Sequence, residues 1–265
     1  MSKAFVQYPI SCSRSRARLR HARRGLPLVF AWIVTGLFPN SLQARDFFPD
    51  LQNTQILSKA LTMRLLPVQD NIPGIVVDLR YATPNNVTHR ALYPPDMPCL
   101  LHPMTLTRLK RAQKILRRQG LRLKIWDAYR PPEAHLELWQ SSKASDFIVP
   151  PEKGLSLHCY GVAVDVTLVD KQGRPLMMPT DHDEFSPAAA SKYTGDNPVI
   201  RYNLETLQKA MKEAGFSTIE SEWWHFVNLE PQGARVIHAS QLGIQLPSTP
   251  SLKATPVNPA DLSQP

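Results

Sequence analysis

Two short segments of the chain combine residue types that bind zinc. In SLHCYGVAVDVTL (156–168), His158 precedes Asp165 by seven residues, and Asp165 stands inside an otherwise apolar run. A carboxylate buried among apolar residues is costly unless it is paired or binds a metal ion. In ESEWWHFV (220–227), aromatic residues enclose His225, which keeps an imidazole neutral and able to bind a metal. Taken alone, such an aspartate is more often an internal hydrogen-bond partner, and such a histidine a core residue.

Glu222, three residues before His225, completes a possible catalytic set. His158, Asp165 and His225 would supply three ligands and leave the fourth position of a tetrahedral zinc ion to water, as in catalytic rather than structural sites. Glu222 is then the expected general base. In a flat strand Glu222 and His225 would face opposite sides. We therefore expect the chain to bend, or to enter the strand, between them.

A third segment, KIWDAYRPPEAH (124–135), presents Arg130 between an expected strand and two prolines that fix its backbone. A rigidly held guanidinium can polarise a carbonyl and stabilise an oxyanion. The alternative is an ordinary surface arginine at a turn.

The elements that must position these side chains follow from hydrophobic spacing and turn residues. We expect strands at residues 62–68, 74–79, 121–126, 161–169 and 223–229, and helices at 105–118, 133–140 and 203–214, the last capped by Asn203. The proline-rich segment 81–98 is expected to be loop. Because strands and helices mix without a regular βαβ alternation, the pattern favours an α+β fold. We expect a single domain with a mostly antiparallel central sheet flanked by helices.

Positive charge is concentrated at the N-terminus. Of the 31 basic residues seven lie in residues 1–44, which contain no acid, so the remainder has 24 basic residues against 22 acidic ones. This near balance argues against nucleic-acid binding. The apolar run 26–38 follows; it is shorter than the roughly 20 residues of a membrane span and typical of a signal peptide. We expect residues 1–44 to be a signal peptide of an exported, periplasmic protein with no stable membrane insertion. An uncleaved anchor and a cytosolic protein with a basic arm are the alternatives.

Five motifs together resemble the D-alanyl-D-alanine dipeptidases of the hedgehog/D,D-peptidase fold. They are WDAYRP, SLHCYGVAVDVTL, EWWHF, DLRYATPNN (78–86) and, more weakly, MPTDHDEF (178–185). The resemblance covers roughly residues 62–230. We therefore expect the zinc dipeptidase domain at 62–240, after a leader at 45–61. The many prolines and few apolar residues near the end of the chain favour a disordered tail at 241–265.

The resemblance also implies a role for each candidate residue. His158, Asp165 and His225 would bind one zinc ion, Glu222 would be the base, and Arg130 would stabilise the transition state. Asp183 would receive the free ammonium group of a small dipeptide substrate, and its neighbour His182 is a further candidate for the wall of the site.

The implied function is zinc-dependent hydrolysis of D-alanyl-D-alanine to D-alanine in cell-wall peptide metabolism. One alternative is a D,D-carboxypeptidase or endopeptidase that cuts peptidoglycan stem peptides with the same zinc site. Another is a non-catalytic zinc-binding module that recognises wall peptides, which would need neither Glu222 nor Arg130. In an oxidising compartment Cys99 and Cys159 would either form a disulfide or remain two small buried thiols.

Overall fold

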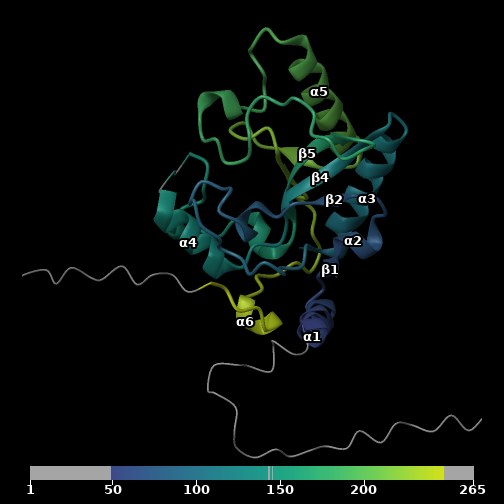
Figure 1. Cartoon of the computed structure of the whole chain (residues 1–265). Coiled ribbons are helices and arrows are strands. Elements are labelled where there is room, and N and C mark those ends of the chain that lie inside the picture. The colour runs from purple at the N-terminus through teal and green to yellow at the C-terminus, as the bar shows by residue number, and fades with distance from the viewer. Residues whose placement is uncertain (1–48, 143, 145, 248–265) are drawn as a thin grey trace, which may run out of the picture. The chain divides into compact units, whose positions relative to one another are not determined.

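The computed structural model describes residues 49–142, 144 and 146–247 (Figure 1). The expected signal peptide lies outside these residues. The helices are α1 (Pro49–Thr62), α2 (Val68–Asn71), α3 (Pro103–Arg117), α4 (Pro132–Ser142), α5 (Pro198–Glu213) and α6 (Ala239–Leu242). The strands are β1 (Leu66–Pro67), β2 (Val76–Val77), β3 (Leu100–Leu101), β4 (Leu121–Asp127), β5 (Ala163–Asp170), β6 (Ser217–Thr218) and β7 (His225–Val227).

A five-stranded sheet in the order β2-β4-β5-β7-β6 forms the centre of the domain. The pairs β4–β5, β5–β7 and β6–β7 are antiparallel, and only β2 pairs in parallel, with β4. Helices α3 and α5 pack against each other and against β4 and β5, respectively (Figure 1). The predicted α+β fold with a mostly antiparallel sheet is therefore confirmed.

Strand β5 is the middle strand of the sheet and is buried from its first residue to its seventh. Val164, Val166 and Leu168 belong to the main hydrophobic core, so alternation turns Asp165 to the opposite face. In the β5–β7 register Asp165 lies opposite His225, the first residue of β7. The sheet itself thus brings together two candidate metal ligands that are 60 residues apart in sequence.

An irregularity in the β4–β5 pairing brings a further carboxylate, that of Asp127, to the pair of Asp165 and His225. The register passes from Ile125 opposite Val166 directly to Asp127 opposite Asp165, so Trp126 is an extra residue on β4. Such a bulge bends its strand and changes the direction of the side chains beyond it. Here it places Asp127 beside Asp165, at the point where β4 leads into Arg130.

Several predicted boundaries were wrong, most of all near the N-terminus. The expected leader forms much of α1, whose Ile56 and Ala60 are buried in the core. The expected strand at 62–68 shrinks to β1, because α1 continues to Thr62 and Arg64 then turns the chain with a positive φ of 61°. A short apolar run does not by itself distinguish helix from strand.

Two further elements differ from expectation at their ends. Helix α5 begins at Pro198 and is capped by Asn197, whose side chain accepts hydrogen bonds from the N–H groups of Val199 and Ile200. Asn203 is not a cap; it lies within α5 and donates to the carbonyl of Met177. At the C-terminus, α6 packs beside α1 and Ile244 is buried, so the fold continues beyond residue 240 (Figure 1). Residues 248–265 of the expected tail lie outside the described residues.

Cys99 and Cys159 are both buried and both free thiols, so the alternative to a disulfide is the one that the structure adopts. Within the described ranges, every helix is too short or too polar to cross a bilayer.

Candidate active site

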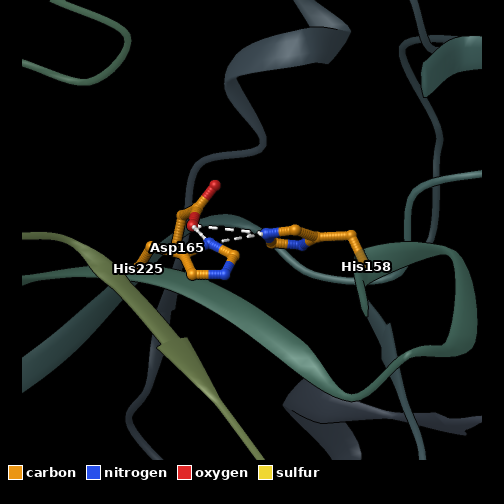
Figure 2. Close-up of side chains that lie close together, drawn as sticks. All are labelled: His158, Asp165 and His225. Carbon is orange, nitrogen blue, oxygen red and sulfur yellow. Dashed lines mark hydrogen bonds and ion pairs between the residues drawn. The ribbon is translucent and has the colours of Figure 1, made fainter. Parts of the chain in front are cut away.

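Three side chains from three different elements converge at one end of β5. His158 lies in a short 3-10 helix, Leu157–Tyr160, just before β5; Asp165 lies in β5, and His225 begins β7. Figure 2 shows their polar ends pointing toward one another. One ligand atom from each residue lies within 4.8 Å of the other two. The three predicted metal ligands are thus brought together.

The spacing and donor chemistry of this triad fit a tetrahedral zinc ion. Asp165 Oδ1 lies 2.9 Å from His225 Nδ1 and 3.3 Å from His158 Nε2, and the two nitrogens are 3.2 Å apart. With zinc–ligand distances of about 2.0–2.1 Å, neighbouring ligand atoms of a tetrahedral site lie about 3.3 Å apart. His158 Nδ1 is 2.7 Å from the carbonyl oxygen of Ala128, to which it donates, so a neutral ring presents an unprotonated Nε2 to the site.

The ionisation of the triad is consistent with a cation between its members. Burial by itself would raise the pKa of Asp165, but the surrounding histidines, His158, His182 and His225, lower it well below its usual range. Burial lowers the pKa of His225. The set therefore tends toward one carboxylate and at least one neutral imidazole, which are the forms that bind metal ions.

Gly161 makes the turn that separates His158 from β5. It has a φ of +67°, which residues with a side chain rarely adopt, and its N–H donates a hydrogen bond to the carbonyl of His158. A Cβ at this position would lie 2.6 Å from a side-chain carbon of Leu65 and 3.1 Å from the backbone nitrogen of His102. The tight turn requires a glycine, and it brings His158 back toward Asp165.

Glu222 lies beside the triad but outside it. Trp223 and Trp224 form a turn between Glu222 and β7, so the expected bend before His225 is present. Glu222 Oε2 is 3.7 Å from His225 Nδ1. Burial raises the pKa of Glu222 well above its usual range, and the negative charges of Asp165 and Asp183 raise it further. A divalent cation at the triad would oppose this shift through its own charge.

Arg130 is a buried site residue, and the alternative of a surface arginine at a turn is wrong. Its Nε and one terminal nitrogen each lie 2.8 Å from Oδ2 of Asp127, and the guanidinium stacks 4.9 Å above the ring of Tyr81. The same terminal nitrogen is 3.8 Å from Oδ2 of Asp165. Asp127 is completely buried and also accepts a 2.8 Å hydrogen bond from Tyr93. These contacts fix the cation beside the triad.

Asp183 occupies another part of the same site. It is buried, and its φ of 60° is uncommon for a residue with a side chain. The Tyr81 hydroxyl donates to its Oδ1 at 3.0 Å, and the backbone N–H of Val87 lies 3.4 Å from its Oδ2. Burial raises the pKa of Asp183 despite the opposing charges of His182 and Arg130. Its ionised form would therefore be stabilised by a further cation.

A cavity of about 330 Å³ connects these groups. Its polar wall includes the triad, Arg130, Asp183 and Glu222. Much of the remaining wall is apolar, formed by Leu138, Phe147, Ile148, Leu157, Phe185 and Trp224. An apolar cavity with a few convergent polar groups is typical of a site for a small molecule. The arrangement suits hydrolysis of a small molecule that carries a positive end.

Residues 61–240 match a family model described as D-ala-D-ala dipeptidase. The chain belongs to this dipeptidase family. It is therefore a metallopeptidase, and the resemblance inferred from the five motifs is confirmed.

Curated relatives carry the same name. The chain is 35% identical to a D-alanyl-D-alanine dipeptidase of Escherichia coli (strain K12) over 165 residues, which are 62% of this chain and 84% of the relative. It is 26% identical to a D-alanyl-D-alanine dipeptidase of Enterococcus faecium over 175 residues, or 59% of this chain and 87% of the relative.

Several residues of this dipeptidase site could not be identified from the sequence alone. Asp127 and Tyr81 lie within two of the five motifs but were given no role, and Tyr93 was expected only to lie in a loop. Asp127 lies three residues before Arg130, a spacing that does not predict an ion pair outside a helix, and residues 128–130 are not helical. His182, a possible wall residue, instead lies behind the metal triad, with Nε2 3.3 Å from Oδ2 of Asp165.

Proposed function

We propose that this protein is a monozinc dipeptidase that hydrolyses D-alanyl-D-alanine to D-alanine. The observation that carries the proposal is the triad of His158, Asp165 and His225 with Glu222 beside it, in a cavity that also contains Asp183. The names of the relatives supply the substrate, and the chemistry of the cavity suits it. An ion at the triad would leave a position for water and lower the pKa of that water to about 7.

Glu222 would move the protons in this reaction. Its carboxylate lies next to the triad, and burial makes it a stronger base than a glutamate in water. It would accept a proton from the attacking water and then donate that proton to the leaving amine. A carboxylate that performs both transfers needs no second acid in the cavity.

Arg130 would stabilise the negative charge that develops on the carbonyl oxygen of the scissile bond. Its guanidinium is positioned in advance by Asp127 and by the ring of Tyr81, so little reorganisation is needed as the charge appears. Because Asp127 is itself held by Tyr93, the cation is directed by a fully buried network.

Asp183 would bind the free ammonium group of the substrate and so select for dipeptides. The carboxyl group is buried at the wall of the cavity, where burial raises its pKa, and a cationic partner would stabilise its ionised form. A stem peptide continues beyond this position and would bring no charge to it. This contact favours dipeptidase activity over the D,D-carboxypeptidase or endopeptidase alternative.

We propose further that the enzyme is exported and acts in the periplasm on peptides of cell-wall metabolism. Support comes from the charge asymmetry and the 13-residue apolar run of residues 1–44. Sequencing the N-terminus of protein isolated from cells should give a start near Arg45. A protein that begins at Met1 would contradict cleavage.

The substrate assignment can be tested with the four stereoisomers of Ala-Ala, each with and without a chelator. D-Ala-D-Ala should be the best substrate, and the chelator should abolish its hydrolysis. Faster cleavage of a blocked pentapeptide ending in D-Ala-D-Ala would instead support the carboxypeptidase function.

A further inference from the structure

The side chain of His182 lies directly behind the metal triad and has no part in the mechanism above. It is completely buried, and its Nε2 lies 3.3 Å from Oδ2 of Asp165 and 3.5 Å from Oδ1 of Asp183. Both neighbours are carboxylate oxygens, which accept hydrogen bonds when ionised. The ring nitrogen between them must therefore carry the proton and act as the donor.

The two oxygens of Asp165 have separate surroundings. Oδ1 faces the ligand nitrogens of His158 and His225, at 3.3 and 2.9 Å. Oδ2 faces away from them, toward His182 Nε2 at 3.3 Å and a terminal nitrogen of Arg130 at 3.8 Å. Of these two groups His182 is the nearer, and the nitrogen of Arg130 already bonds to Asp127 at 2.8 Å. His182 is thus the main donor to the oxygen that the triad does not use.

The imidazole of His182 is held in place by aromatic rings. Its centroid lies 5.6 Å from that of Tyr81, 5.3 Å from Trp126 and 5.7 Å from Trp224, at interplanar angles between 45° and 65°. Its Nδ1 is buried without a hydrogen-bond partner among the described residues. The ring therefore makes its polar contacts only through Nε2, and its packing leaves that nitrogen little freedom to turn away.

We propose that His182 is a positioning residue that fixes the orientation of the metal ligand Asp165. By donating to Oδ2, it turns Oδ1 toward the two ligand histidines and makes Asp165 a ligand through one oxygen. Its N–H also lies between the carboxylates of Asp165 and Asp183 and reduces their mutual repulsion. The inference rests on the proposed metal site, and it links that site to the proposed ammonium site through a single donor.

Two substitutions separate donation from packing. His182→Phe keeps a planar ring among Tyr81, Trp126 and Trp224 but removes the N–H. His182→Gln places an amide nitrogen near the position of Nε2 and so retains a donor to Asp165. The zinc dissociation constant of each purified variant is measured by competition with a chelator, and the unfolding temperature of the metal-free form reports on packing.

His182→Phe should weaken zinc binding by about 10–100-fold, the usual effect of losing a partner of a metal ligand. His182→Gln should bind zinc within about threefold of the wild-type protein. Wild-type affinity in His182→Phe would overturn the inference, and so would an equal loss in both variants, because packing alone would then explain it. If the Phe variant does not fold, His182→Met tests the same loss of the donor, and it too must bind zinc more weakly.

These measurements distinguish the inference from the function on which it rests. A wild-type protein that binds no zinc would overturn the metal proposal together with the role of His182. If the wild-type protein binds zinc and His182→Phe binds it equally well, only the role of His182 would be overturned. Neither result depends on which dipeptide the enzyme cleaves.

Discussion

Glu222 Oε2 lies 3.7 Å from Nδ1 of His225, three residues later in the chain, because a turn at Trp223 and Trp224 separates the two. In a continuous strand their side chains would point to opposite faces of the sheet. The turn therefore places a carboxylate beside the metal triad without making it a fourth ligand. This relationship divides metal binding from proton transfer, and it predicts variants that lose one and keep the other.

Glu222→Ala should retain zinc and lose turnover. General acid–base catalysis typically contributes about 10²–10⁴-fold, so kcat should fall by a factor in this range. Metal content by mass spectrometry and kcat on D-Ala-D-Ala measure the two effects separately. Glu220→Ala, in the same segment but exposed, is the matched control and should behave as wild type. Near-normal turnover in Glu222→Ala would mean that another group is the base.

Arg130→Ala should also retain zinc, with kcat/KM about 10²–10³-fold lower, the scale of one lost oxyanion donor. Arg130→Lys should have a kcat/KM nearly as low as that of Arg130→Ala. One ammonium group cannot reproduce the two contacts that Nε and the terminal nitrogen make with Asp127. Arg118→Ala, an exposed arginine that follows α3, serves as the control. Recovery of full activity by lysine would show that only the charge matters.

N-acetyl-D-Ala-D-Ala should be cleaved at least about tenfold more slowly than the free dipeptide. A charge-assisted hydrogen bond of about 1.5–3 kcal/mol between Asp183 and the ammonium group corresponds to roughly 10–150-fold in kcat/KM. Asp183→Asn should slow cleavage of the free dipeptide and narrow the difference between the two substrates. Glu184→Gln, next in the chain but exposed, should leave the difference unchanged. Equal rates on both substrates would remove Asp183 from this role.

The motif residues could be predicted from the sequence because chemistry constrains each of them locally. Asp165 is conspicuous in an apolar strand, His225 among aromatic residues, and Arg130 before two prolines. The central part of the fold was predictable for a related reason. Strands β4 and β5 and helix α3 carry clear periodicity, and each lies within a few residues of its expected range.

The remaining features of the site and fold depend on contacts between segments that are far apart in the chain. The spacing of residues along the sequence does not specify such contacts. The bulge at Trp126 sets Asp127 opposite Asp165, and nothing local marks it. Tyr81 contacts Asp183 and His182, which lie about 100 residues later in the chain. The segment expected to lead into the fold forms much of helix α1, and α1 packs beside α6, which follows much later in the chain.

Metal content of the purified protein tests the central claim most directly. The wild-type protein and the control His89→Ala, an exposed histidine, should each contain close to one zinc ion per chain. His158→Ala and His225→Ala should each lose most of it, because two remaining ligands do not make a stable tetrahedral site. Full zinc occupancy in both of these variants would contradict the assignment of the triad.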